Sequence, residues 1–408
     1  MEINGDRLWR RLMHMAEIGA IAGNGVNRQA LSSEEIASWH LMIRWAQASD
    51  LHPCTDAFGN LFIVLAGRDR LAPPLLLGSH LDSQPTGGRF DGVYGVLAAL
   101  EVLVRLREAG YEPACDVVAV AWMNEEGSRF APGMMGSAGF AGARSLNTIR
   151  SCRDAEGISV GQALDALHAA TGLPTYACMS PPAAYLEAHI EQATQLEQAQ
   201  SVIGVVRGIQ GKYTWQVTLN GEGGHAGTVP MPVRRDALAA FTRIAQALYQ
   251  QVGGTEAAAL FTIGWLTVVP NAPSVIPHRV QFRIDLRHPD AQVLQRLAIR
   301  CEAIISQQAA PCDVQLEGLS AALPNAFDPG LQTAIAEAAI ARGYPAMPVL
   351  SAAGHDARYL AAICPSAMIF IPCREGISHE PTEWAEPAHV SAGGQVLMDV
   401  TLQWLMKR

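Results

Sequence analysis

The sequence has few charged residues and no long hydrophobic run. Only 16% of the 408 residues are charged and 49% are hydrophobic, which indicates a globular protein and not a disordered chain. No apolar run approaches the roughly 20 residues that a membrane-spanning helix requires, so we expect no membrane partner. The chain is longer than one ordinary domain, and we therefore expect two or three domains with large hydrophobic cores.

Basic patches, paired cysteines and a secretion signal are also missing. The formal net charge is -9, and the sequence contains no stripe of basic residues that could neutralise phosphates. Both features argue against a nucleic-acid partner. None of the eight cysteines forms a C-x-x-C pair, so zinc held by cysteines is not expected. The segment MEINGDRLWRRLMHMAEIGA is typical of an amphipathic helix and has no hydrophobic signal core. We therefore expect a cytoplasmic protein with free thiols.

Short apolar runs alternate with helix-like segments in the first half of the chain. APPLLLGSH and CDVVAVAWMNEE suit strands that are buried on both faces. Between them, GVYGVLAALEVLVRLREAG has the length of a helix closed by Gly110. This strand–helix–strand order predicts a largely parallel sheet. Upstream, SSEEIASWHLMIRWAQASD predicts a serine-capped helix, and Gly59-Asn60 predicts a hairpin.

The pattern changes near residue 208. KYTWQVTLNG and RVQFRIDLRH alternate apolar and polar side chains, as strands do in a sheet that is covered on one face. Helical segments at residues 235–252 and 290–308, with a further strand in CDVQLEG, give a βαββαβ-like order. Buried-type runs such as SAMIFIPC return afterwards. The sequence therefore predicts an α/β domain over residues 1–208 and 325–408, interrupted by an α+β domain over residues 209–324.

Histidines and acids follow the predicted buried strands. Ligands of open α/β sheets gather at the carboxyl ends of strands, so we expect these side chains to converge at one edge. Zinc-like metals take imidazole and carboxylate ligands, whereas calcium and magnesium prefer oxygen alone. Taken singly, each residue also has an ordinary structural explanation, such as a capped turn, a solvated strand end or a core histidine. The candidates are His80, Asp82, Asp91, Glu125, Glu126, His189 and His379.

Six segments occur in one order between about residue 78 and residue 384, and so span nearly the whole chain. They are GSHLDSQPTGGRFDG, NEEGSRF, EAHIEQ, GGHAGTVPMPVRRDA, AGHDA and GISHEPTEW. Together they resemble the M20-type metallo-amidohydrolases, and within them the hydantoinase/carbamoylase branch. That branch contains N-carbamoyl-L-amino acid hydrolases, allantoate amidohydrolases and β-ureidopropionases. The resemblance implies an inserted ferredoxin-like domain that acts as a lid and forms a homodimer.

The resemblance further implies two divalent metal ions that share the carboxylate of Asp91. Zinc or manganese would occupy the sites, with cobalt and nickel as alternatives. The implied additional ligands are His80 and His189 at one site, and Glu126 and His379 at the other.

Three residues receive catalytic roles from the resemblance. Glu125 would take a proton from a water molecule whose pKa a metal lowers, and would return it to the leaving nitrogen. Asp82 would accept a hydrogen bond from His80 and fix its tautomer. His225 would reach an active site across a dimer interface and stabilise the oxyanion. A histidine that caps the helix starting near Arg235 is the structural alternative.

Substrate contacts are implied less completely. Arg287 in a D-x-R strand would bind the substrate carboxylate, because a planar guanidinium suits bidentate pairing; an ordinary strand-end charge is the alternative. Gln192 would contact the ureido group, and Gly354 of AGHDA is a further binding candidate. The family usually carries asparagine just before VIP, where this chain has Ser274, although Asn271 lies close by in the sequence.

The function favoured by the sequence is hydrolysis of the ureido C–N bond of an N-carbamoyl-L-amino acid, with release of ammonia and carbon dioxide. Allantoate or β-ureidopropionate is the alternative substrate. An aminoacylase or dipeptidase is a more distant alternative, because EAHIEQ has histidine where many peptidase relatives supply an acid. A catalytically inactive scaffold should have lost Glu125 or a metal ligand, and the sequence retains all of them.

Overall fold

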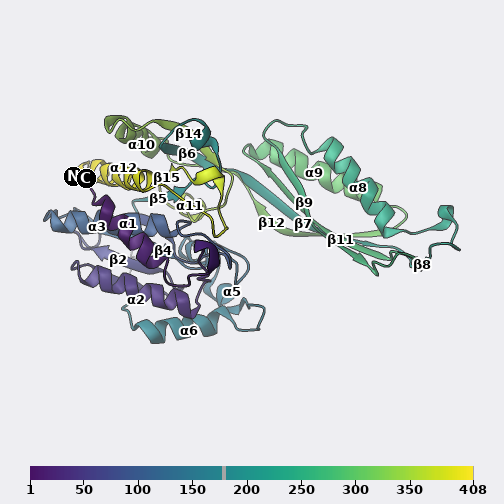
Figure 1. Cartoon of the computed structure of the whole chain (residues 1–408), viewed down its shortest axis with the longest axis horizontal. Coiled ribbons are helices and arrows are strands. Elements are labelled where there is room, and N and C mark those ends of the chain that lie inside the picture. The colour runs from purple at the N-terminus through teal and green to yellow at the C-terminus, as the bar shows by residue number, and fades with distance from the viewer. Residues whose placement is uncertain (177–180, 408) are drawn as a thin grey trace. The chain divides into compact units, whose positions relative to one another are not determined.

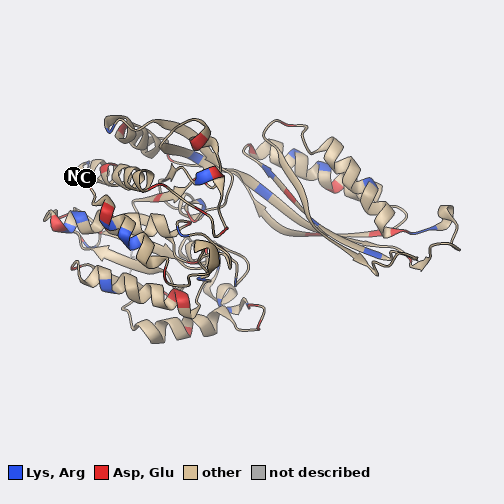
Figure 2. Ribbon diagram, in the orientation of Figure 1, with Lys and Arg blue, Asp and Glu red and all other residues tan. Residues whose placement is uncertain are grey.

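The computed structural model describes residues 1–176 and 181–407, and the chain divides into two compact units (Figure 1). Unit 1 comprises Met1–Gly208 and Ala326–Arg408, and unit 2 comprises Ile209–Asn325. Among the described helices, none combines the length and the hydropathy needed to cross a membrane. Cys178 lies outside the described residues. Lysine and arginine are interspersed with aspartate and glutamate on both units (Figure 2).

A nine-stranded sheet lies at the centre of unit 1. Its strands are β1 (His52–Thr55), β2 (Leu61–Leu65), β3 (Leu75–His80), β4 (Val117–Trp122), β5 (Ala184–Ile190), β6 (Ile203–Ile209), β13 (Asn325–Ala326), β14 (Ala346–Ser351) and β15 (Ser366–Ile371). The order is β1-β2-β4-β3-β5-β15-β6-β13, and β14 pairs with β6. Strands β4, β3, β5 and β15 run parallel, whereas β1–β2, β2–β4 and β6–β15 are antiparallel pairs. The predicted parallel sheet and hairpin are confirmed.

Unit 1 also contains helices. They are α1 (Gly5–Met15), α2 (Ser33–Gln47), α3 (Val93–Glu108), α4 (Met135–Phe140), α5 (Leu146–Ser151), α6 (Val160–Thr171), α7 (Gln195–Gln198), α10 (Pro329–Ala341), α11 (Ala357–Leu360) and α12 (Pro387–Met406), with 3-10 turns η1 (Ala22–Asn24) and η3 (Arg374–Gly376). Helix α3 packs on β3, β4 and β5, and α12 packs on α3 and β15. Ser32 caps α2 by accepting a hydrogen bond from the Glu35 N–H, as the sequence predicted.

Burial and register explain where the polar side chains emerge. Every residue of β3, β4 and β5 is buried, which is why these strands appear as continuous apolar runs. In the parallel register His80 lies beside Trp122, and His189 lies beside Phe370 of β15. The segments that follow these strands therefore leave the sheet at the same edge.

Unit 2 contains a four-stranded antiparallel sheet of order β12-β7-β11-β9. Its elements are β7 (Gly211–Asn220), β8 (Gly224–His225), η2 (Met231–Val233), α8 (Ala237–Gln251), β9 (Leu260–Val269), β10 (Val275–Ile276), β11 (Arg279–His288), α9 (Ala291–Gln308) and β12 (Asp313–Ala322). Helices α8 and α9 pack on β7 and β11, whose buried apolar residues alternate along the strands. The ferredoxin-like order confirms the predicted α+β class of this unit.

Candidate active site

Two buried histidines point their Nε2 atoms at one oxygen of Asp91. His189 Nε2 lies 3.1 Å from Asp91 Oδ1, and His80 Nε2 lies 3.7 Å from the same oxygen. The opposite nitrogens donate to main-chain carbonyls: His80 Nδ1 to Asp82 O at 2.9 Å, and His189 Nδ1 to Ile190 O at 2.8 Å. In the neutral rings both Nε2 atoms therefore carry lone pairs, which is the form that binds a metal.

A glycine next to Asp91 leaves room for the His80 ring to lie close to the Asp91 carboxylate. Gly92 directly precedes α3 with φ 67°, in the left-handed region that favours glycine. A Cβ at this position would lie 2.3–2.4 Å from ring atoms of His80. The turn that places Asp91 at the start of α3 therefore requires glycine both for its backbone conformation and for space.

The other oxygen of Asp91 faces a second group of side chains. His379 Nε2 lies 3.0 Å from Asp91 Oδ2 and 3.4 Å from Glu126 Oε2. Glu126 Oε2 also accepts a hydrogen bond from Gln84 Nε2 at 2.7 Å, while Glu126 Oε1 is buried with no hydrogen-bond partner in the described part of the chain. Asp91 thus stands between two potential ligand groups, one for each oxygen.

The donor set fits divalent metal ions. A tetrahedral ion with bonds of about 2.0–2.2 Å separates its ligand atoms by about 3.4 Å, close to the spacing within both groups. Burial alone would raise the pKa of Asp91, but the hydrogen bonds and charges of His189, His379 and His80 hold that pKa well below its ordinary value. Lone pairs and a carboxylate that converge in this way need a cation or protons between them.

Glu125 lies beside the first group with its carboxylate buried. Its Oε2 is 3.7 Å from His80 Nε2. Burial raises the pKa of Glu125 well above its ordinary value, and the charges of Asp356, Glu126 and Asp82 raise it further, against the opposing charge of His80. A carboxylate whose pKa is raised holds a proton more readily than an ordinary one, as a general base requires.

Asp82 contacts both His80 and the two glutamates. The His80 Nδ1–H donates to the main-chain carbonyl of Asp82, and the carboxylate Oδ1 is farther away, at 3.5 Å. The carboxylate instead accepts the main-chain N–H groups of Glu125 and Glu126, both at 3.1 Å. A buried carboxylate attracts N–H donors from the loop that turns back over it, and sequence spacing does not reveal this partner. Asp82 thus binds the main chain of both glutamates.

Gln192 also reaches the centre of the site. Its Nε2 donates to Asp91 Oδ2 at 3.0 Å and to Ser378 Oγ at 3.1 Å, while its Oε1 is buried without a partner among the described residues. Gln192 and His379 have φ values of 58° and 60°. Non-glycine residues adopt this conformation at a cost, and they often do so at functional sites.

Several residues of this region escaped sequence analysis. His355 is buried with its ring centroid 4.6 Å from that of His189, and it forms a third potential ligand group with His189 and Glu187. Burial and the charge of His189 lower the pKa of His355 well below its ordinary value. The AGHDA motif contains this histidine, directly after the predicted binding residue Gly354. A Cβ on Gly354 would lie 3.1 Å from Met134 Cε.

The remaining candidates lie in unit 2. His225 is exposed on β8, and its Nδ1 accepts the Gly227 N–H at 3.0 Å, so in the neutral ring Nε2 carries the proton. Arg287 donates through Nε and Nη2 to Asp285, at 2.7 and 3.1 Å. Ser274 contributes its main-chain carbonyl to the Ala226 N–H, and Asn271 is exposed with φ 56°. The structure of unit 2 by itself shows no substrate role for these residues.

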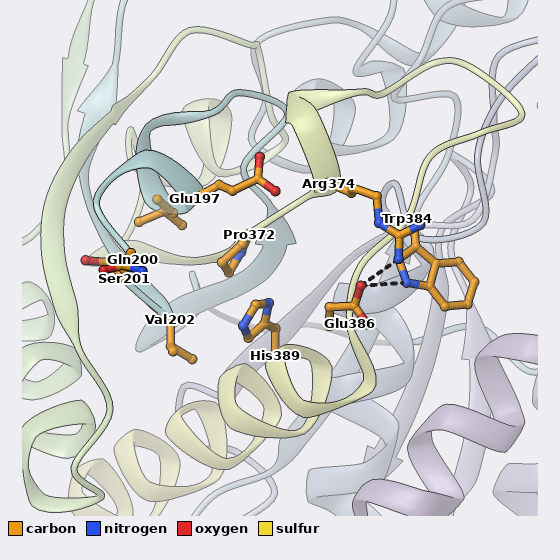
Figure 3. A pocket seen from close by; sticks show the side chains of 10 residues that line it. Glu197, Gln200, Ser201, Val202, Pro372, Arg374, Trp384, Glu386 and His389 are labelled. Atoms are coloured by element: carbon orange, nitrogen blue, oxygen red, sulfur yellow. Dashed lines mark hydrogen bonds and ion pairs between the residues drawn. The ribbon is translucent and has the colours of Figure 1, made fainter.

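A separate pocket is lined in part by Pro372, Arg374, Trp384 and Glu386 (Figure 3). It has a volume of about 280 Å³, and none of the predicted site residues line it. On its wall the Arg374 side chain and the Trp384 indole N–H both donate to Glu386, at 2.7 and 3.1 Å. These contacts fasten the base of the loop that carries His379.

Comparison with known proteins identifies the family. The model of peptidase family M20/M25/M40 matches residues 76–403. The chain is 36% identical over 405 residues to an N-carbamoyl-L-amino-acid amidohydrolase of Rhizobium meliloti, which covers 98% of this chain and 96% of the relative. It is 34% identical over 389 residues to the allantoate amidohydrolase of Bacillus subtilis, covering 95% and 94%. A crystal structure of a hydantoinase/carbamoylase family amidase from Burkholderia multivorans has 41% identity and a TM-score of 0.88, with 98% of each chain covered.

The chain therefore belongs to peptidase family M20/M25/M40. Within that family it belongs to the hydantoinase/carbamoylase branch of amidohydrolases, as its motifs indicated. The prediction of a metal-dependent hydrolase that acts on C–N bonds other than peptide bonds is confirmed at this level.

Proposed function

We propose that the chain hydrolyses the carbamoyl group of an N-carbamoyl-L-amino acid to the amino acid, ammonia and carbon dioxide. The observation that carries the proposal is Asp91, whose Oδ1 faces two histidines and whose Oδ2 faces His379 near Glu126. Relatives named for carbamoyl amino acids, one 36% and another 37% identical to the chain, supply the substrate class.

Two divalent ions would be held by Asp91 together with the histidines and Glu126, and would supply Lewis acidity toward the attacking water and the scissile carbonyl. Glu125 takes the proton from that water and returns it to the leaving nitrogen. Asp82 holds the main chain of Glu125, and hence the direction of its carboxylate, through the 3.1 Å hydrogen bond. Gln192 presents a buried, unpaired Oε1 that suits an amide N–H of the ureido group.

The substrate carboxylate is assigned to Arg287. Its guanidinium is already held by Asp285, which also pairs with Lys212 Nζ at 3.1 Å. A planar guanidinium presented in this way has a fixed orientation. Ser274 and Asn271 flank the turn near β10 as further candidates, and Gly354 leaves room beside Met134.

His225 is proposed to donate from Nε2 to the developing oxyanion in the partner subunit of a homodimer that forms through unit 2. The Gly227 N–H selects the tautomer that this donation requires. Mixing subunits that carry Glu125→Gln with subunits that carry His225→Ala tests it. If His225 serves the partner, each mixed dimer has one intact site, and random mixing restores about a quarter of wild-type activity. If His225 serves its own subunit, no activity returns.

The substrate is tested with a panel. Purified protein loaded with zinc or manganese is incubated with N-carbamoyl amino acids, allantoate, β-ureidopropionate, N-acetyl amino acids and dipeptides, and ammonia and free amine are measured. The highest kcat/KM is expected for an N-carbamoyl-L-amino acid. Hydrolysis of acyl amino acids or dipeptides without ammonia release would replace the proposal with an aminoacylase or dipeptidase function.

Allantoate is the second candidate substrate. Relatives named as allantoate amidohydrolases from Bacillus subtilis and Escherichia coli are 34% and 33% identical to the chain. Both substrates carry a ureido group and a carboxylate, so the same metal centre and the same arginine would serve either. A higher kcat/KM for allantoate in the panel would select this function.

A further inference from the structure

Glu383 is a buried acid in the loop between η3 and α12. Glu383 is 2% exposed. In the sequence it is far from the GSHLDSQPTGGRFDG motif that contains Asp91. Oε1 accepts the main-chain N–H groups of Phe90 and Asp91, at 2.9 and 3.1 Å. The Glu383 carboxylate therefore binds the main chain of Asp91, the residue that lies between the two potential ligand groups.

The other oxygen of Glu383 faces the loop segment that carries His379. Oε2 accepts a hydrogen bond from Ser378 Oγ at 2.8 Å. The same hydroxyl lies 3.2 Å from Asp91 Oδ2, so it is shared between the two carboxylates. One side chain thus connects the main chain at Asp91 with the residue next to His379.

The glycine-rich turn before Asp91 leaves space for this acid. A Cβ on Gly88 would lie 2.1 Å from Glu383 Cδ and 2.2 Å from its Oε1. No side chain fits there without displacement of the carboxylate. A substitution at Gly88 therefore displaces the Glu383 carboxylate while residue 383 stays glutamate.

The two ends of this loop are held together by hydrogen bonds that do not involve Glu383. The Arg374 N–H donates to the Trp384 carbonyl at 2.8 Å, and Arg374 and Trp384 both donate to Glu386 (Figure 3). Glu386 is thus an acid three residues from Glu383 whose hydrogen bonds are with Arg374 and Trp384 and not with Asp91 or Ser378. It supplies a matched control.

We propose that Glu383 is a positioning residue of the metal centre, which sets the distance between Asp91 and His379 by binding the Asp91 main chain and Ser378 together. The inference rests on the proposed metal centre, and it concerns chiefly the ion that Asp91, Glu126 and His379 would hold. His80 and His189 come from the sheet and keep their orientation through their own main-chain carbonyls.

Loss of the carboxylate leaves the Phe90 and Asp91 N–H groups without this acceptor and leaves the Ser378 hydroxyl with Asp91 Oδ2 alone. Residues that orient metal ligands typically contribute 10–100-fold to metal affinity, and we expect a loss of about that size at one of the two sites in Glu383→Ala. Glu383→Gln keeps the shape: its Oε1 accepts the same two N–H groups, and its amide donates to Ser378 Oγ. It should therefore retain most of the affinity.

The experiment compares wild type, Glu383→Ala, Glu383→Gln, Gly88→Ala and Glu386→Gln. Metal-free proteins are titrated with zinc and with cobalt against a competing chelator, and the cobalt absorption spectrum reports the geometry of each site. Thermal unfolding of the metal-free proteins shows whether each variant folds. We expect weaker binding of one ion, with an altered cobalt spectrum, in Glu383→Ala and Gly88→Ala. Glu383→Gln and Glu386→Gln should resemble wild type.

Each outcome is decisive for a different claim. Equal losses in Glu383→Gln and Glu383→Ala would mean that charge alone acts, and wild-type affinity in Glu383→Ala would mean that the residue has no such role; either overturns the inference. Wild type that fails to bind two ions removes the metal centre itself. Two ions bound, with no hydrolysis of any ureide, leaves this inference intact and removes the proposed substrate.

Discussion

The role of Asp82 gives the sharpest test of how the site is built. Its carboxylate is fully buried and accepts one main-chain N–H on each oxygen, from Glu125 and Glu126. Asp82→Asn changes one oxygen to an amide NH₂. The asparagine keeps one acceptor, while its amide faces an N–H group that is itself a donor. The substitution therefore breaks one of the two hydrogen bonds without changing the size of the side chain.

The size of the effect follows from that geometry. A hydrogen bond to a charged group contributes about 1.5–3 kcal/mol, and a buried donor left unpaired costs about 1–3 kcal/mol. Removal of a negative charge beside two glutamates offsets part of this loss, so we expect the free energy of unfolding to fall by about 2–4 kcal/mol. A shift of about 1 Å in a catalytic group costs about 100-fold in rate. We expect kcat to fall by about 10–100-fold, with a smaller change in KM.

Urea unfolding and steady-state kinetics at saturating metal measure both quantities. Asp116→Asn is the matched control, because Asp116 is also buried, accepts the Gly67 N–H at 2.9 Å and lies at the start of β4, outside the cluster of metal-binding candidates. That control should lose stability and keep its kcat. An unchanged kcat in Asp82→Asn, with normal metal content, would refute the claim that Asp82 holds Glu125 in place.

Three other perturbations have defined outcomes. Burial and the charge of Asp82 raise the pKa of Glu35 to about 8 from its ordinary 4.5, so the folded state holds a proton that the unfolded chain releases, and stability falls as pH rises from 4.5 to about 8. Glu35→Gln should make urea unfolding of the metal-free protein less dependent on pH across that window. Chelation should abolish turnover and lower Tm, and added zinc or manganese should restore both; activity that persists after complete metal removal contradicts the metal centre. Gly78→Ala should cost more than about 1 kcal/mol in urea unfolding, because Gly78 has φ 155° and a Cβ would lie 2.0 Å from the Val120 carbonyl oxygen; wild-type stability would show that the backbone relaxes.

The central sheet could be predicted because its strands are buried throughout. The runs that became β3 and β4 had no polar residue before their ends, and Gly110 marked the end of the helix between them. Strand β9 was not identified, because most of its residues are partly or fully exposed and its edge position imposes no regular alternation. The short strands β13 and β14 add to the sheet edge through tertiary contacts, for which a local pattern gives little signal.

The sequence predicted which residues form the candidate site better than it predicted the hydrogen bonds between them. His80, Asp91 and His189 were expected at one edge, and both histidine Nε2 atoms lie within 3.7 Å of Asp91 Oδ1. Glu383 lies in the GISHEPTEW motif, but its role could not be predicted, because its partners are main-chain groups almost 300 positions away along the chain. No sequence pattern encodes which backbone N–H a folded loop will present to a buried acid.

The histidines and the acids of this site are oriented by different means, and the difference predicts how each tolerates change. His80 and His189 donate to carbonyls one or two residues away, so their orientation is fixed as soon as their own strands form. Asp82 and Glu383 instead accept N–H groups from segments that are distant in the sequence. The acids therefore hold separate loops together, while the Nδ1 hydrogen bonds of the two histidines are local. Substitutions near a histidine strand should act on one ligand, whereas loss of either acid should disturb several groups at once, because each acid binds two backbone N–H groups of residues in the centre.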